Sequence, residues 1–310
     1  MTDQLRRSVA RPSQQGFVLV TVLWLLAALA ALATIFSVYL SNSARALTLN
    51  DTALQAQALV SAGVELAAYR LQLAGEDSRP AQGSFRVRLS GAEISVSFVS
   101  EAARVDLNGA PKELLAGLLS VLGANEEAAK EGADRIVAWR TKAAQETAGN
   151  EDALYQAAGR AYQPRQAPFA HVNELGLVLG LTPELVERAL PFVTVFSGAS
   201  GVDALIAPAE VIAALPGMTP LTLKQFLQDR ATLPNDNEAI AAALGEAKAN
   251  ATAQKSRAYR IQTRIRFLRG RETASEIVIG LRGTEEPYRV LSWQDDVPLH
   301  QLASRELQAR

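Results

Sequence analysis

The stretch QQGFVLVTVLWLLAALAALATIFSVYL, from Gln14 to Leu40, contains no charged residue and decides how the rest of the chain is interpreted. Three arginines, Arg6, Arg7 and Arg11, lie just before it. An apolar run of this kind fits three alternatives. It can be a secretory signal that is cut away, a plain membrane anchor, or a segment that is processed at one end and then used for assembly.

Length and flanking charge narrow these alternatives. Phe17 to Leu40 is a run of 24 uncharged residues. As a helix it is about 36 Å long, enough to cross a hydrocarbon core of about 30 Å. The core of an ordinary signal peptide is shorter, about 7–15 residues. The arginines predict that the N-terminal end stays in the cytoplasm and that the rest of the chain lies outside. Composition alone favours an uncleaved signal anchor.

The bulk composition sets outer limits on the function. With 310 residues, the chain can form one large domain or two ordinary ones. Its net charge of −1 gives no electrostatic case for nucleic acid as the main partner. The absence of cysteine excludes disulfides, thiolate nucleophiles and cysteine-based metal sites.

The segment after the apolar run has a helical pattern. Apolar side chains recur in residues 46–74 at three-, four- and seven-residue steps, which places them on one stripe of a helix. They are Leu47, Leu54, Ala58, Ala62, Leu66, Tyr69 and Leu73. We therefore expect one long rod, half in lipid and half packed on a globular domain. Gly75 to Gly83 predicts its end.

Strand patterns flank a long helical region. Apolar and polar residues alternate over 85–90 and 94–98, around a turn that contains Gly91. The same alternation returns over 259–267 and 277–281, with a last strand at about 288–293. Between them, residues 108–253 carry short amphipathic patterns opened by Pro, Asn, Asp or Thr, as helix capping requires.

The helical region contains a weak internal repeat. DLNGAPKELLAGL, at 106–118, aligns with DALIAPAEVIAAL, at 203–215. In each, a strand end or turn is followed by a proline in the first turn of an apolar helix. A real duplication and a chance match in an alanine-rich chain both remain open.

No catalytic site emerges from the sequence, and we expect the protein not to be an enzyme. His171 and His300 are far apart and lack metal-ligand spacing, so structural or surface roles are favoured. There is no glycine-rich phosphate loop, paired-carboxylate motif or nucleophile elbow.

A helix-hairpin-helix pattern, LPGMTPLTLKQFLQDR, begins at Leu215. Such motifs grip DNA phosphates in other proteins. Here Lys224 and Arg230 are accompanied by Asp229 and by no basic cluster. A compact helix turn is therefore the favoured interpretation.

Two polar clusters offer the oxygen ligands that calcium uses, NDNE at 235–238 and QDD at 294–296. Neither matches a complete calcium-binding loop. Helix capping or solvation explains each more economically, and the metal-binding residues stay unknown.

A family resemblance begins at the opening stretch. A basic leader, Gly16-Phe17 and about twenty apolar residues resemble the class III signal of type IV pilins and pseudopilins. The resemblance implies that prepilin peptidase cleaves between Gly16 and Phe17 and methylates the new N-terminus. Most members carry Glu at the fifth mature position, where it pairs with a neighbouring subunit's N-terminus. This chain has Thr21 there.

The missing glutamate narrows the resemblance to one branch. A carboxylate left unpaired in lipid is costly, so Thr21 suits a subunit at the end of a fibre, which has no such neighbour. The absence resembles the K-type minor pseudopilin of type II secretion systems, general secretion pathway protein K.

Three later segments also resemble the K type. They are VDLNGAPKELLAGLLSVLG with ADRIVAWR, then FAHVNELGLVLGLTPELVERALPFVTVF, then APAEVIAALPGM. One departure is Val202–Ile206, which replaces an asparagine-rich turn of the family. The resemblance extends from Gly16 to about Trp293.

The resemblance implies an α+β fold: a pilin-like long N-terminal helix packed on an antiparallel sheet, with a large all-helical domain inserted between the sheet strands. The predicted boundaries are 1–16 for a cytoplasmic leader peptide, 17–40 for the transmembrane part of the helix, 41–75 for its periplasmic continuation, 76–108 for the first part of the α/β domain, 109–253 for the helical insertion, and 254–310 for the second part and the C-terminal tail.

The resemblance also implies a place in the cell and a set of partners. The protein would be a single-pass protein of the bacterial inner membrane with a periplasmic domain. It would initiate and cap a short pseudopilus driven by a partner ATPase. Its partners would be the I-type and J-type minor pseudopilins, other pseudopilins, prepilin peptidase and the inner-membrane assembly platform. The resemblance assigns no cofactor, and calcium, which some pseudopilins carry, is a structural candidate.

Two rivals from other classes stay open. One is a membrane-anchored periplasmic helix-hairpin-helix protein that binds DNA for uptake. The other is a membrane-anchored enzyme, which the absence of a recognisable site disfavours.

Overall fold

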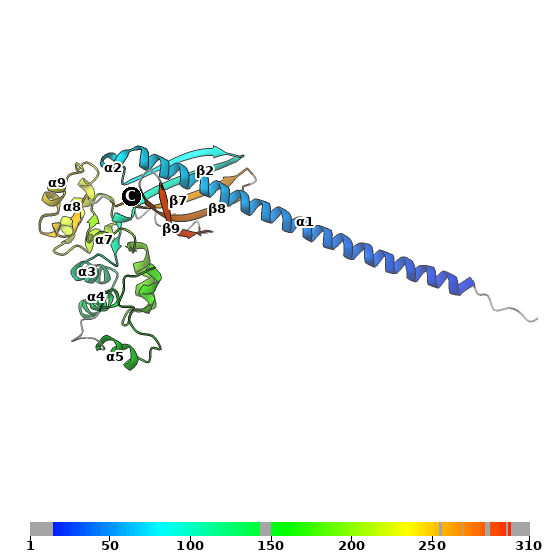
Figure 1. The fold of residues 1–310 in the computed structure, drawn as a ribbon, viewed down its shortest axis with the longest axis horizontal. Coiled ribbons are helices and arrows are strands. Elements are labelled where there is room, and N and C mark those ends of the chain that lie inside the picture. The colour runs from blue at the N-terminus through cyan, green and yellow to red at the C-terminus, as the bar shows by residue number, and fades with distance from the viewer. Residues whose placement is uncertain are drawn as a thin grey trace, which may run out of the picture. The chain divides into compact units, whose positions relative to one another are not determined.

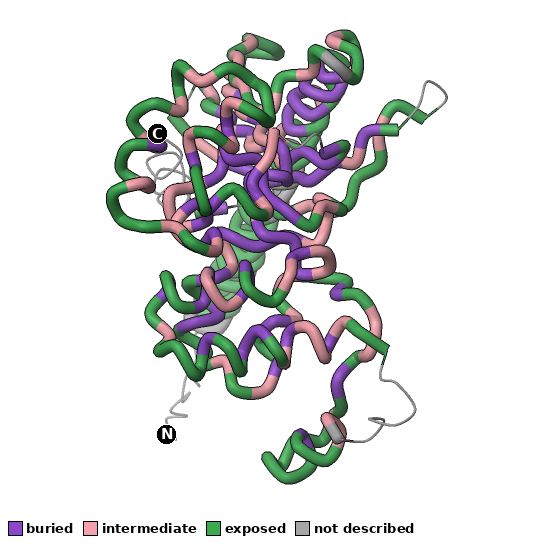
Figure 2. Tube along the Cα trace, turned by 90° about the vertical axis from the view of Figure 1, so that its left-hand side faces the viewer, coloured by how far each residue is buried: buried purple, intermediate pink, exposed green. Residues whose placement is uncertain are grey.

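The computed structural model describes residues 15–142, 150–253, 256–268, 270–282, 286–295 and 297–298. The chain divides into two units, Met1–Ala58 and Leu59–Arg310. One helix, α1 (Gln15–Leu73), belongs to both (Figure 1). In the first unit, its segment Val18–Asn42 has a mean hydropathy of 2.6 and is long and apolar enough to cross a membrane. The residues of this segment are exposed, and Figure 2 colours them green.

In the second unit, α1 packs on a five-stranded antiparallel sheet. The strands are β1 (Gln82–Leu89), β2 (Ala92–Ser100), β7 (Ala258–Phe267), β8 (Glu272–Leu281) and β9 (Tyr288–Gln294), and their order across the sheet is β1-β2-β7-β8-β9. The short helix α2 (Gly75–Ser78) occupies the predicted break. The predicted α+β class, with a long N-terminal helix on an antiparallel sheet, is confirmed.

The face of α1 that meets the sheet combines three small residues with leucines and valines. Its buried members are Leu59, Val60, Gly63, Val64, Ala67, Ala68 and Leu71. Gly63 marks the close approach, because a Cβ atom there would lie 3.2 Å from side-chain methyl carbons of Val96 and Thr263. These residues form one buried cluster with the alternate residues of β2, β7 and β8.

The prediction of which apolar stripe of α1 packs on the domain is wrong. Leu66, Tyr69 and Leu73 are 37%, 63% and 72% exposed, and Leu54 in the first unit is 58% exposed. Leu47 has no described side chain. The helix carries two apolar stripes, and the sheet selects the one whose small residues allow a close backbone approach. Larger side chains on the other stripe would hold the helix away from the sheet.

The segment between β2 and β7 is the predicted helical insertion, and Figure 1 shows it gathered at one end of the sheet. Its elements are η1 (Glu101–Ala103), β3 (Val105–Asp106), α3 (Lys112–Val121), α4 (Glu126–Arg140), α5 (Asn150–Ala157), η2 (Val172–Leu177), α6 (Pro183–Ala189), η3 (Leu190–Phe192), β4 (Val193–Thr194), β5 (Val202–Asp203), α7 (Ala209–Ala213), α8 (Pro220–Asp229), α9 (Asn237–Leu244), η4 (Gly245–Lys248) and β6 (Ala251–Thr252). Two parallel strand pairs, β3 with β4 and β5 with β6, were not predicted.

The strand pairs show that the sequence repeat is a structural duplication. Each copy begins with a strand that ends in aspartate, Asp106 or Asp203. Its Oδ1 accepts a hydrogen bond from the amide two residues later, Asn108 at 2.8 Å or Leu205 at 3.1 Å. A proline then precedes α3 or α7, and each copy ends in the strand that pairs with its first.

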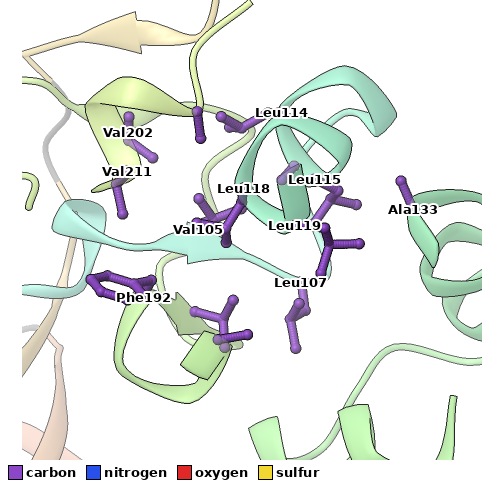
Figure 3. Close-up of a cluster of buried hydrophobic side chains, with 14 of the residues drawn as sticks. Val105, Leu107, Leu114, Leu115, Leu118, Leu119, Ala133, Phe192, Val202 and Val211 are labelled. Atoms are coloured by element: carbon purple, nitrogen blue, oxygen red, sulfur yellow. The ribbon is translucent and has the colours of Figure 1, made fainter. Parts of the chain in front are cut away.

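The two copies share one core and pack through equivalent positions. Gly117 of α3 and Ala214, just after α7, align in the repeat, and a Cβ atom on Gly117 would lie 2.1 Å from the Ala214 carbonyl oxygen. The buried cluster draws residues from both copies. Figure 3 shows Leu118 of α3 with Val105 of the first copy and Val202 and Val211 of the second.

Gly117→Ala should therefore destabilise the protein by at least about 2 kcal/mol, because backbone must move to admit the methyl group. Urea unfolding of the full-length protein in detergent, followed by the fluorescence of the buried Trp139, measures this change. Gly176→Ala is the matched control, since a Cβ atom there meets nothing within 4 Å. Equal stability of the two variants would contradict the close approach of α3 to Ala214.

Candidate assembly site

The residues predicted to be processed lie at the start of α1. The helix begins at Gln15, so the backbones of Gly16 and Phe17 belong to its first turn. Thr21 follows one turn later and is exposed. Val18 to Asn42 contains no charged residue. The structure thus places the predicted cleavage point at the helix end and Thr21 within the apolar segment. The cleavage itself stays a prediction.

In the second unit, α1 presents an outward stripe on the side away from the sheet, formed by Leu66, Tyr69 and Leu73. Three- and four-residue steps align these side chains along the helix. Apolar side chains exposed in a row are typical of a surface that another helix covers.

Polar contacts on both flanks fix the rotation of α1 and so keep this stripe outward. On one flank, the Arg70 guanidinium lies 3.9 Å above the ring of Phe85 in β1. On the other, the Tyr288 hydroxyl of β9 donates to Glu65 Oε1 at 2.7 Å. Gln72 also donates to the carbonyl of Pro287.

A buried ion network joins the insertion to the sheet. Glu101 of η1 is fully buried, and its carboxylate accepts from Arg260 of β7, with Nε 2.8 Å from Oε1. Arg104 donates to the same oxygen at 3.2 Å, and Thr194 of β4 donates to Oε2. Arg260 in turn pairs with Glu276 of β8. The network therefore ties both ends of the first copy to the centre of the sheet.

The protonation of Glu101 depends on these partners. Burial by itself raises the pKa of a carboxyl group. The guanidinium groups of Arg260 and Arg104, with their hydrogen bonds, outweigh the burial and hold the pKa of Glu101 below its ordinary value of 4.5. Sequence reasoning missed this residue, since one glutamate after a strand gives no sign of burial.

The strand-end aspartates of the two copies differ in environment. Asp106 Oδ2 accepts from the Ser197 hydroxyl at 2.9 Å and from the Gly198 amide at 2.8 Å. Burial raises the pKa of Asp203 to about 6, and the Leu205 amide offsets only part of this effect. The segment Val202–Ile206 thus forms an aspartate turn like that of the first copy, around a more weakly hydrogen-bonded carboxylate.

The described residues of the two predicted calcium clusters make structural hydrogen bonds. Asp236 caps α9 by accepting from the Ala239 amide at 3.1 Å, and Asn237 accepts from the Ala253 amide at 2.8 Å. Asp295 Oδ1 accepts from Ser275 and Trp293. Within the described ranges, no group of three or more His, Asp or Glu side chains stands close enough to hold a metal. Asp296 lies outside those ranges.

The remaining candidate residues have structural contacts. His171 caps η2, with Nδ1 accepting from the Asn173 amide at 3.1 Å, and His300 lies outside the described residues. The helix-hairpin-helix pattern, which begins at Leu215, forms the turn after α7, with Gly217 at positive φ, and then α8. Arg230 there donates to the Ala207 carbonyl at 2.8 Å, which turns its guanidinium inward.

These features define a class of protein. A helix with an apolar first part packs one face, with Gly63 at its close approach, on an antiparallel sheet and exposes a second apolar stripe. This is a pilin-like fold, here with a duplicated helical insertion.

Comparison with known families finds a similarity over part of the chain. Residues 97–198, about a third of the chain, match the family model described as type II secretion system (T2SS), protein K. The match ends just after β4, where the first copy ends. The resemblance predicted from the sequence is confirmed over this segment, which is similar to protein K of the type II secretion system.

A solved structure shares the fold. It is described as the crystal structure of the GspK-GspI-GspJ complex from the enterotoxigenic Escherichia coli type 2 secretion system. The TM-score is 0.60 at 18% identity, covering 81% of this chain and 98% of that chain. No curated protein sequence matches this chain.

Glu101→Gln should cost about 3 kcal/mol at pH 7, because it leaves Arg260 buried with less opposing charge. Since the pKa of Glu101 is lowered by folding, its contribution is full at neutral pH and is lost as the pH falls through that lowered pKa. Urea unfolding at several pH values should show the gap between wild type and variant narrowing in acid.

The control is Glu126→Gln, which removes an exposed pair with Lys130. Its unfolding midpoint should stay at the wild-type value. A Glu101→Gln variant as stable as this control would show that the network does not hold the insertion.

Proposed function

We propose that this protein is the tip subunit of the type II secretion pseudopilus, which initiates and caps the fibre that drives export of folded proteins across the outer membrane. The observation that carries the proposal is Thr21, an uncharged residue at the position where fibre subunits place a glutamate. A subunit at the tip has no preceding subunit whose N-terminus needs a carboxylate partner, and an unpaired carboxylate in lipid is costly.

The proposed pathway starts in the inner membrane. Residues 1–16 form a cytoplasmic leader, prepilin peptidase cuts after Gly16, and Phe17 becomes the methylated N-terminus. The apolar part of α1 holds the subunit in the membrane until assembly. The domain that follows is periplasmic.

The outward stripe of α1 supplies the contact with neighbours in the fibre. Leu66, Tyr69 and Leu73 continue the apolar character of the span into the folded domain. Burying a large apolar side chain stabilises an interface by about 1.5–3 kcal/mol. The I-type and J-type minor pseudopilins are the proposed partners, a choice supported by the complex named in the matching structure.

The place of the insertion supports a tip position. It joins the sheet at the end of β2 and the start of β7, and Arg257 there pairs with Glu76, just beyond the C-terminal end of α1. A subunit stacked beyond that end would meet the insertion. Its role is mechanical, and the assembly energy comes from a partner ATPase.

Mass spectrometry of the protein from cells with a working secretion system should find an N-terminus at methylated Phe17. Cells without prepilin peptidase serve as the control and should retain Met1. The processed chain should also co-purify with the I-type and J-type proteins after detergent extraction. Intact Met1 in the presence of the peptidase would exclude the proposed processing.

A further inference from the structure

Asp106 and Asp203 occupy equivalent places in the two copies of the insertion, but their carboxylates are not equally satisfied. Both residues are buried, at 1% and 4% exposure. Three hydrogen bonds reach the Asp106 carboxylate, from the Asn108 amide, the Ser197 hydroxyl and the Gly198 amide. Among the described residues, one reaches the Asp203 carboxylate, from the Leu205 amide at 3.1 Å. Burial with so few donors favours the neutral form of a carboxyl group.

The threonines opposite the two aspartates differ in the same way. In the paired strands, Thr194 lies opposite Asp106, and Thr252 lies opposite Asp203. The Thr194 hydroxyl donates to the Glu101 carboxylate. The Thr252 hydroxyl oxygen is buried and has no hydrogen-bond partner in the described part of the chain. The side chain paired with Asp203 thus gives a negative charge there no hydrogen bond.

No positive charge of the described residues pairs with Asp203. Its strand, β5, packs on η1, where the Glu101 carboxylate is turned to its two arginine partners. On β7, Tyr259 lies within electrostatic reach of Asp203. Burial raises the pKa of Tyr259 to about 12, so its hydroxyl is neutral at ordinary pH. An ionised Asp203 would therefore be a buried charge without an opposite charge.

Other charged groups near the strand pair have other contacts or are exposed. Arg79 acts on Tyr259, and its guanidinium donates to a carbonyl of α1 at 2.9 Å. Helices α9 and η4 pack on β6, and their charged residues are exposed. These are Glu238, Glu246 and Lys248. Lys255, the lysine nearest to Thr252 in the sequence, lies outside the described residues.

We propose that Asp203 makes the pairing of β5 with β6 sensitive to pH. The neutral carboxyl group keeps the pair closed, and loss of its proton to water opens it, because the carboxylate is hydrated only outside the core. The pairing is short, with two residues on each strand. The Val202 amide donates to the Asn250 carbonyl at 2.8 Å, and the Ala204 amide donates to the Thr252 carbonyl at 3.2 Å.

Opening this pair would release the end of the second copy, because β6 leads from the insertion to β7. The proposal does not depend on N-terminal processing or on a tip position.

Asp203 stabilises the closed pair most at low pH. Burial raises its pKa to about 6 from 3.8. A carboxyl group whose pKa is raised by folding stabilises the closed pair fully below pH 3.8, and this contribution is lost as the pH rises through about 6. The opening constant of the pair should therefore be about tenfold larger at pH 7.5 than at pH 5. Glu101 does not titrate in this range, because its pKa is held below 4.5.

Hydrogen exchange followed by mass spectrometry, on the full-length protein in a non-ionic detergent, measures this opening. After correction for the intrinsic pH dependence of amide exchange, peptides covering 202–207 and 250–253 should be about tenfold less protected at pH 7.5 than at pH 5. The β3–β4 pair of the first copy is the matched internal control, and its protection should agree within twofold at the two pH values. Equal protection of the β5–β6 pair at both pH values, or an equal loss in both strand pairs, would overturn the proposal.

Asp203→Asn removes the titrating group and keeps the size of the side chain. In this variant the protection of the β5–β6 pair should agree within twofold at the two pH values. Glu246→Gln, which changes an exposed carboxylate of η4, is the control and should keep the tenfold difference of the wild type. A tenfold difference that persists in Asp203→Asn would refute the assignment.

The wild-type comparison keeps the proposal testable if Asp203→Asn fails to fold, since both strand pairs are measured in one molecule. Lys255→Gln then separates a lone carboxyl group from one that is paired with a cation. This variant should keep the wild-type pH dependence. Its loss would assign the effect to an ion pair and contradict the proposal.

Discussion

The structure depends on α1, because this one helix must present apolar side chains to different surroundings along its length. These are a membrane, the sheet of its own domain and a proposed partner. Its first part is apolar on every side, as a membrane requires. Its last four turns divide their surface between two stripes. Small residues around Gly63, Ala67 and Ala68 meet the sheet, and Leu66, Tyr69 and Leu73 stay outside. Only this division lets the helix fold with its own domain and still offer an apolar surface for assembly.

The helical insertion is a large segment that must be attached to a small sheet in a fixed position. Duplication supplies much of its core, since the two copies cross at Gly117 and Ala214 and bury one shared cluster. The attachment to the sheet is polar. Glu101, Arg260 and Glu276 are almost fully enclosed and satisfy one another, so loss of one partner leaves an uncompensated buried charge. Such a network stabilises one docking geometry against alternatives that leave the charges unpaired.

Elements with a strong local signal could be predicted from the sequence. Alternation located the strands around Gly91, and the uninterrupted apolar run located the start of α1. The Asp-to-Pro pattern pointed to the duplication before its strand pairs were visible. Periodicity could not decide which of two apolar stripes would be buried, because hydrophobicity favours Leu66 and Leu73 whereas close approach favours Gly63. The roles of Glu101 and Arg260 depend on residues 159 positions apart and leave no local trace.

The central claim is that the outward stripe of α1 is the assembly face of the proposed minor pseudopilin. The most direct measurement is crosslinking in cells from a photo-crosslinking amino acid placed at position 69, with position 88 on the opposite sheet face as the comparison. The account predicts a crosslink from position 69 to another pseudopilin, and none of comparable yield from position 88. Efficient crosslinking from position 88 with none from position 69, in a correctly processed chain, would contradict it.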